Sequence, residues 1–233
     1  MALPKIDLPI FETTLLSTDE KIKFRPYTVK EEKILLVAQE SKDQTQEVLA
    51  TKQVVNNCLM DKDVSDLAMF DLEYILLTLR SRSVDNTIVF NIIDPESKEN
   101  VSLTLDLEAV SLLRDDKHSN EVAINGDYKL FLKYPTIDQY VAISAIDVND
   151  PLVNYYIMIS CLDYVASEDE VHYFKDHTKE EVDSFMEEVS GEVLKKIQNF
   201  FETMPRLRHE LKYTNKNGKE QTFVIEGMRT FFI

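Results

Sequence analysis

Two histidines lie five residues apart in the acidic segment EDEVHYFKDH, residues 168 to 177. Imidazole nitrogens and carboxylate oxygens at close spacing can ligate a divalent metal ion. On a helix, however, an offset of five residues does not place His172 and His177 on the same face. We therefore interpret this segment as an ordinary polar loop and predict that the chain binds no metal.

Other candidate chemistry is equally sparse. Cys58 and Cys161 each lie in an apolar pattern typical of a helix, so both are expected to be buried, reduced thiols. The sequence lacks the motifs of phosphate-binding loops, dinucleotide sites, serine hydrolases and zinc proteases. Among 42 carboxylates, the choice of any two as an acid and base pair is arbitrary. We predict no catalytic residue, no cofactor and no enzymatic activity.

The formal net charge is -16, and it is unevenly distributed. Between Ala145 and Glu192 there are 13 Asp and Glu against two lysines. Since Lys and Arg supply most of the affinity for a phosphate backbone, we do not expect nucleic-acid binding. The acidic region is either a solvated face or a surface for a basic partner. No apolar run is long enough to span a bilayer and no signal peptide is recognisable, which predicts a cytoplasmic protein.

Hydrophobic periodicity predicts an α+β fold with a helical majority. Capping residues and apolar spacing place the helices from Thr28, from Gln44 to about Met60, from Phe70 to about Ser83, from Thr136 to about Ile146, from Pro151 to about Val165, from Thr178 to about Val189 and from Ser190 to about Met204.

Turn signals predict several antiparallel β-hairpins: one N-terminal, two central and one C-terminal. The turns are Ser17-Thr18-Asp19, Asp94-Pro95-Glu96-Ser97, Asn125-Gly126 and Asn217-Gly218. The stretches KIKFRPYTVKEEKILL and YKLFLKYPTIDQYVAIS share a strand, a Pro corner and a capped helix. Either the fold repeats a hairpin-to-helix unit, or the same local physics occurs twice. Without a flexible linker, we expect a single domain over residues 1–233, with a subdivision possible near 84–135, a hairpin-rich insert.

The segment IQNFFETMPRLRHELKYTNKNGKEQ, residues 197 to 221, joins an apolar helix to basic residues through Pro205. An exposed aromatic beside arginines has the composition of a binding hot spot, whereas the alternative is that both Phe rings lie in the core. We nominate as a partner interface Phe200, Phe201, Met204, Arg206, Leu207 and Arg208. The rival surface is the acidic stretch from Glu168 to Glu192.

Four separated motifs then indicate a family. IKFRPYTVKEEKILLVAQES, FDLEYILLTLRSRSV, IQNFFETMPRLRHELKY and IEGMRTFF, with LKYPTIDQY between them, resemble the baseplate hub proteins of T-even-type tailed bacteriophages (myophages). That family contains a hub subunit and a related hub assembly protein, and the resemblance runs from about Leu3 to Phe232. It implies a phage-encoded protein made in the host cell cytoplasm, with no enzymatic activity, that acts in building the hub of a contractile tail baseplate.

Some relatives carry Cys-x-x-Cys knuckles in two hairpin turns. The matching turns of this chain, IIDPESKEN and YTNKNGKEQ, contain no cysteine. We therefore do not carry zinc over to this protein, and we expect Pro and Asn-Gly chemistry alone to hold both turns.

The resemblance favours a non-enzymatic hub assembly factor, a chaperone-like binder of hub or tail-tube components. The alternatives are a structural subunit of the mature baseplate hub and, from another class, an acidic nucleic-acid mimic that binds a basic host protein. The expected partners are other phage baseplate hub or tail proteins. The sequence leaves open the partner's identity, the copy number, the oligomeric state and whether the protein stays in the virion tail baseplate.

Overall fold

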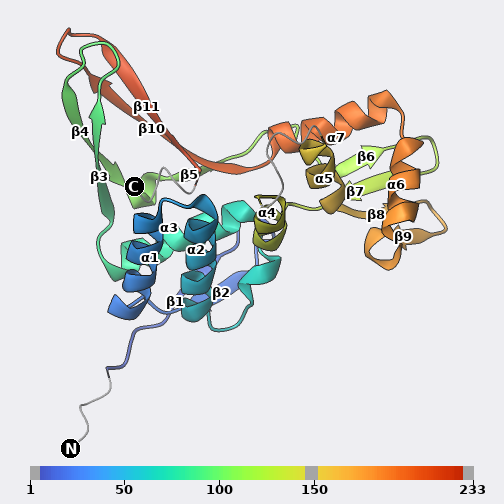
Figure 1. Cartoon of the computed structure of the whole chain (residues 1–233), viewed down its shortest axis with the longest axis horizontal. Coiled ribbons are helices and arrows are strands. Elements are labelled where there is room, and N and C mark those ends of the chain that lie inside the picture. Colours follow the sequence, from blue (N-terminus) through green and yellow to red (C-terminus); the bar gives the residue numbers. More distant parts are fainter. Residues whose placement is uncertain (1–5, 145–151, 228–233) are drawn as a thin grey trace, which may run out of the picture. The chain divides into compact units, whose positions relative to one another are not determined.

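A computed structural model describes residues 6–144 and 152–227 and divides the chain into two compact units (Figure 1). Unit 1 comprises Met1–Leu113 with Arg206–Ile233, and unit 2 comprises Arg114–Pro205. The boundary at Arg114 falls inside the range 84–135 where we expected a subdivision. Whether the chain folds as a single domain stays a prediction, because contact density alone does not measure independent folding.

Unit 1 combines three helices with three hairpins. A short N-terminal hairpin precedes the helices, a long hairpin follows them, and a second long hairpin comes from the C-terminal part of the chain. Its elements are β1 (Phe11–Thr14), β2 (Lys21–Phe24), α1 (Val29–Ser41), α2 (Gln44–Cys58), η1 (Val64–Asp66), α3 (Met69–Ser83), β3 (Thr87–Ile93), β4 (Asn100–Asp106), η2 (Leu107–Ala109) and β5 (Ser111–Leu113), with β10 (Arg206–Thr214) and β11 (Glu220–Glu226) from the C-terminal part. The sheet orders are β1-β2, β3-β4 and β11-β10-β5, all antiparallel.

Unit 2 packs helices against one four-stranded antiparallel sheet of order β6-β7-β8-β9. Its elements are β6 (Glu121–Ala123), β7 (Lys129–Leu132), α4 (Ile137–Ser144), α5 (Val153–Ser160), β8 (Leu162–Ala166), β9 (Val171–Tyr173), η3 (Phe174–Asp176), α6 (Lys179–Glu187) and α7 (Gly191–Thr203). Leu130 of the sheet and Ile197 and Phe200 of α7 are buried together in its core.

Local chemistry explains where several helices begin. The Thr28 hydroxyl caps α1, and Glu31 accepts a hydrogen bond from the Thr28 amide at 2.9 Å. Thr178 and Glu181 form the same capping box at α6. Pro205 follows the end of α7, as its effect on the preceding residue predicts. These interactions join residues only a few positions apart, which is why the sequence predicts them.

The predicted helical majority is wrong. Helices account for 41% and strands for 28% of the structure, so the fold is mixed α+β with four small antiparallel sheets among the described residues. The expected helix through Val165 ends at Ser160, and Leu162–Ala166 instead forms β8 between β7 and β9. Pairing on both edges of this short apolar run decides its conformation, and periodicity alone does not distinguish the two outcomes. The expected helix end near Ile146 and start at Pro151 lie outside the described residues.

The hairpin-to-helix pattern occurs in both units with matching contacts. In unit 1, Phe24 pairs with Leu59 and the Arg25 amide donates to the Cys58 carbonyl at 3.0 Å. In unit 2, Leu132 pairs with Leu162 and the Lys133 amide donates to the Cys161 carbonyl at 2.8 Å. In each unit, the second strand of a hairpin thus pairs with the chain just after a pair of helices. A buried cysteine, Cys58 or Cys161, lies at the end of the second helix in each case.

The helix starts of the two repeats match as well. Gln139 accepts from the Thr136 amide at 2.8 Å, as Glu31 does from Thr28. Arg25, between β2 and α1, donates to the Asn57 carbonyl, and Gln139, in the first turn of α4, donates to the Ser160 carbonyl. In each repeat a side chain near the start of the first helix is thus bound to the end of the second helix, although the two donors are not at equivalent positions. These shared long-range contacts favour a repeated unit over a coincidence of local physics.

Candidate functional site

Two of the nominated interface residues, Phe200 and Leu207, belong to two different cores. Phe200 is 1% exposed and its ring lies 5.6 Å from that of Tyr134 in unit 2, whereas Leu207 is 1% exposed in unit 1. Neither side chain is available on the surface, so the nomination of Phe200 and Leu207 as interface residues needs correction, and for Phe200 the alternative of a core position holds. The physical reason is that Pro205 separates a core-facing helix from a core-facing strand.

The remaining nominated residues retain partial exposure. Phe201 and Met204 are half-buried, and Arg206 is exposed. Arg206 and Arg208 lie 3.3 Å and 3.6 Å from carboxylate oxygens of Glu226, so their charges are engaged within unit 1. Their participation in partner binding stays a prediction.

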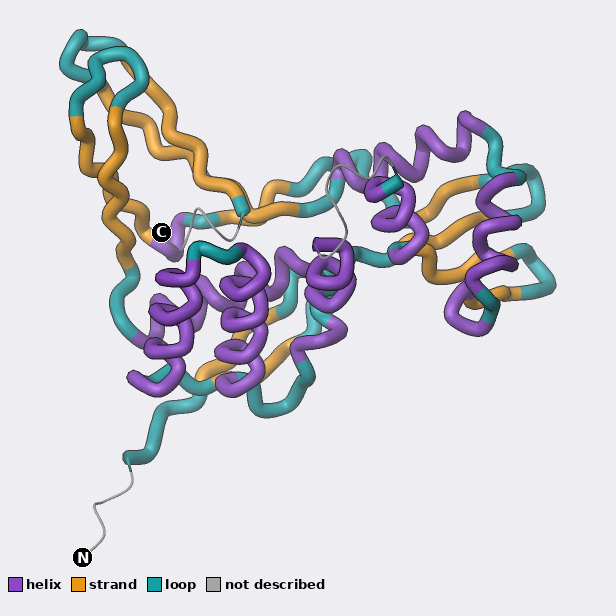
Figure 2. The backbone as a smooth tube through the Cα atoms, in the orientation of Figure 1, coloured by secondary structure: helices purple, strands orange, loops and turns teal. Residues whose placement is uncertain are grey.

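Unit 1 places its two long hairpins face to face, and we call β3, β4, β10 and β11 with their turns the arm. Figure 2 shows the two hairpins, drawn in orange, converging on a shared tip at the upper left. Side chains on the facing sides form one core, in which the rings of Phe90 and Phe223 lie 5.6 Å apart. Alternation along each strand directs Ile88 and Phe90 inward and Val89 outward.

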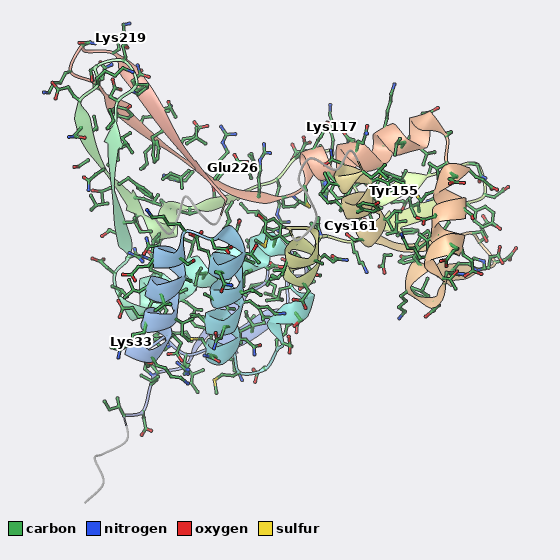
Figure 3. The ribbon with its side chains drawn as sticks, in the orientation of Figure 1. Lys33, Lys117, Tyr155, Cys161, Lys219 and Glu226 are labelled. Atoms are coloured by element: carbon green, nitrogen blue, oxygen red, sulfur yellow. The ribbon has the colours of Figure 1, made fainter. Side chains whose placement is uncertain are left out.

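The tips of the two hairpins are joined by a polar network that we call the clasp. Asp94, from the β3–β4 turn, is fully buried and accepts a hydrogen bond from the Tyr213 hydroxyl at 2.8 Å. Glu96 forms an ion pair with Lys219 and accepts a hydrogen bond from the side-chain amide of Gln221 at 3.1 Å. The clasp consists of Asp94, Glu96, Tyr213, Asn215, Lys219 and Gln221. Lys219 marks this end of the arm and Glu226 the other in Figure 3.

The same side chains also shape the turns. Asp94 accepts from the amides of Glu96 at 3.1 Å and Ser97 at 2.6 Å, and Lys98 closes that turn with a φ of 59°. In the other turn, Asn215 accepts from the Lys219 amide at 3.0 Å, and Gly218 has a φ of 77°. These hydrogen bonds fix the conformation of each turn, so the side chains of the clasp are held in position to contact the opposite turn.

The hydrogen bonds and the ion pair of the clasp shift the pKa values of its titratable side chains. Backbone amides, chiefly that of Ser97, and the Tyr213 hydroxyl lower the pKa of Asp94 to about 2. The ion pair with Lys219 lowers the pKa of Glu96, and the bond to Asp94 raises the pKa of Tyr213. Asp94 is therefore ionised at neutral pH and buried with its hydrogen bonds made, as a buried charge requires.

The two turns named in the sequence analysis are thus held by more than Pro and Asn-Gly chemistry. Each is held by the other, across about 120 positions of sequence. Within the described residues, no group of three or more His, Cys, Asp or Glu is placed to hold a metal ion.

The outer surface of the arm offers unpaired strand edges. Among the described strands, β3 and β4 pair only with each other, and β11 pairs only with β10. On the outward side of β3, Val89 is 56% exposed and Ile93 67% exposed. Unpaired main-chain groups beside exposed apolar side chains can accept a strand or an apolar surface from another protein.

Unit 2 brings together two histidines that sequence spacing separates. His172 lies on β9 and His177 follows η3, so neither is helical, and their rings are 6.1 Å apart. The segment that we predicted to be an ordinary polar loop therefore contains a short strand and a 3-10 turn, and the argument from helical spacing does not apply to this pair. A short strand followed by a single turn returns the chain on itself, and no periodic signal predicts that geometry.

Comparison with known protein families identifies the family of this chain. The family model described as T4 bacteriophage base plate protein matches residues 8–233, which include both units and the whole arm. The chain belongs to the T4 bacteriophage base plate protein family. No curated protein and no solved structure shows significant similarity to it.

Membership of this family shows where the baseplate protein has its role. It acts in a phage tail baseplate, and its partners are other phage baseplate proteins. In the part of the chain that the structure describes, no helix has the length and apolar character needed to cross a membrane.

Proposed function

We propose that this baseplate protein is a non-enzymatic hub assembly factor, which binds a hub or tail-tube component while the contractile tail is being built. The observation that supports this role is the arm, whose hairpins are joined by a shared core and by the clasp. Its open edges carry Val89 and Ile93 outward. Such a surface would cover an edge strand or apolar patch of a partner that otherwise pairs too early.

The charge of unit 2 favours a reversible complex over a permanent one. Unit 2 holds 19 Asp and Glu against 8 Lys and Arg, a net charge of -11. Electrostatic attraction speeds encounter with a basic partner, and interfaces held by exposed charges exchange readily. Permanent interfaces are instead largely apolar. A later baseplate subunit could therefore displace this protein from its partner.

Quantitative mass spectrometry of assembly intermediates and mature virions tests the proposal. We expect the protein in hub intermediates captured from infected cells, together with other baseplate proteins, and not at a fixed copy number in mature virions. A fixed copy number in virions would instead assign it as a structural subunit of the hub. Capture of host nucleic-acid-binding proteins alone, released by about 0.5 M salt, would support the mimic.

A further inference from the structure

Unit 2 contains a pocket of about 500 Å³ between its sheet and α6. The buried side chains of Val165 and Val182 line its floor. Phe174 and Phe185 line it as well, with their rings 5.3 Å apart in an edge-to-face arrangement. This volume is large enough to enclose a bulky apolar group, and the buried valines and the two phenylalanine rings are suited to contact one.

One wall of the pocket is polar. Tyr128 and His172 both line the pocket and both bind Glu170, with the Tyr128 hydroxyl donating at 2.5 Å and the His172 Nε2 at 3.2 Å from the carboxylate. His177 lies 3.5 Å from Glu181, which also lines the pocket. These contacts hold two carboxylates beside the mouth of an apolar cavity.

The surroundings add further negative charge. Glu188 lines the pocket and is exposed. Helix α6 carries acidic residues at Glu180, Asp183 and Glu187, and the loop before β9 adds Glu168 and Asp169, so carboxylates outnumber the two neighbouring lysines, of which Lys179 lies 4.0 Å from Asp183. A phosphate, nucleotide or carboxylate ligand would be repelled here, whereas Lys and Arg would be attracted.

We infer that this pocket, which we call the α6 pocket, receives one aromatic or long apolar side chain from a basic segment of a partner protein. Lysines or arginines flanking that side chain would pair with Glu170, Glu181 and Glu188. An apolar anchor in a pocket surrounded by charge pairs is a common arrangement of binding hot spots. The inference rests on the proposed function only in taking the partner to be a baseplate component.

Binding of short peptides to the purified full-length protein tests the inference. The probe is fluorescein-labelled Lys-Lys-Phe-Lys-Lys, measured by fluorescence anisotropy and by chemical-shift changes at the amides of Ile124 and Val189, which line the pocket. We expect this peptide to bind at least about tenfold more tightly than Lys-Lys-Ala-Lys-Lys, because the Ala peptide lacks the apolar anchor. Equal binding of the two peptides would overturn the inference.

A matched pair of charge reversals locates the binding site. Glu188→Lys changes the pocket, whereas Glu202→Lys makes the same change of net charge at an exposed position of α7 outside it. We expect about a fivefold loss of affinity for the Phe peptide in the first variant and little change in the second. Equal losses would mean attraction to the acidic surface as a whole and would overturn the inference. Circular dichroism of both variants tests whether each is folded.

The outcome is separable from that of the proposed function. If the peptide binds at the α6 pocket but the protein is found at a fixed copy number in virions, the pocket stands and the assembly role fails. If the assembly role holds and the Phe peptide does not bind, the inference about the pocket fails.

Discussion

At the scale of single residues, Asp94 is the buried carboxylate that links the turn of one hairpin of the arm to the other hairpin. It accepts hydrogen bonds from two amides of its own turn and from Tyr213 of the opposite hairpin. We expect Asp94→Asn to accelerate amide hydrogen exchange in β10 and β11 about tenfold, because the substitution replaces an acceptor with a donor in a buried network. Glu220→Gln, at an exposed position at the start of β11 beside the Asn217-Gly218 turn, is the control and should leave exchange unchanged.

The clasp should also respond to acid. The folded-state pKa of Asp94, about 2, lies below its ordinary value of 3.8, so the ionised carboxylate stabilises the arm. That contribution is fully present above about pH 4 and is lost as the pH falls from 3.8 through the folded-state pKa. Hydrogen exchange of β10 and β11 at pH 5 and pH 3 should therefore differ more in the wild type than in Asp94→Asn. An identical response of both proteins would contradict this assignment.

His118 should make unit 2 less stable at mildly acidic pH, above the range in which Asp94 titrates. Its ring nitrogens lie 2.9 Å from the Thr203 hydroxyl and 3.0 Å from the Tyr134 hydroxyl, and burial lowers its pKa below 6.5. The folded state then binds fewer protons than the unfolded state, so stability decreases as the pH falls through 6.5 toward the folded-state pKa.

Melting curves at pH 7.5 and pH 5.5 test the role of His118. We expect the melting temperature of the wild type to fall more between these pH values than that of His118→Gln, which cannot take up a proton. The carboxylates contribute equally to both proteins, so the difference between them reports His118. An equal fall in both would show that another group is responsible.

At the scale of elements, two hairpin glycines offer a matched comparison. Gly218 has a φ of 77°, whereas Gly126, in the turn between β6 and β7, is not in the left-handed region, and neither position is crowded. We expect Gly218→Ala to lower the free energy of unfolding by about 1 kcal/mol and Gly126→Ala to leave it unchanged or slightly higher. Urea titration measures both, and similar losses would contradict the turn assignment.

The outer side of β3 is the element that we expect to contact the partner. The double variant Val89→Lys with Ile93→Lys should reduce the recovery of baseplate proteins from infected cells at least about fivefold, because lysines oppose strand addition and apolar contact. Val29→Lys with Val37→Lys removes two similarly exposed valines from α1 and is the control. If the two double variants recover baseplate proteins equally well, or lose them equally, the arm is not the binding surface.

At the scale of the whole molecule, the prediction concerns salt. The chain carries a net charge of -16, of which unit 2 contributes -11. We expect its association rate with a basic baseplate partner to fall about tenfold between 0.05 M and 0.5 M salt, roughly as charges become screened beyond the Debye length. Biolayer interferometry measures this rate. A rate independent of salt would show that apolar contact, and not charge, governs encounter.

Much of the fold could be predicted because its signals are local. The helix starts at Thr28 and Thr178, the stop at Pro205 and the C-terminal hairpin each depend on residues within about four positions of one another. The same Asn-Gly pair nevertheless forms two different turns. At Asn217-Gly218 the glycine adopts a positive φ. At Asn125-Gly126 the glycine does not, and the Asn125 side chain caps the turn by accepting hydrogen bonds from the backbone amides of Asp127 and Tyr128.

The sequence by itself determined the family, the acidic character and the local starts and stops of the elements. Only the tertiary structure decided that Leu162–Ala166 is a strand, that Phe200 and Leu207 lie in separate cores and that His172 and His177 share a pocket. It also decided that Asp94 meets Tyr213, 119 residues away. The physical reason is that strand pairing, burial and side-chain networks depend on contacts between distant segments, whereas capping and turn formation need only neighbours along the chain.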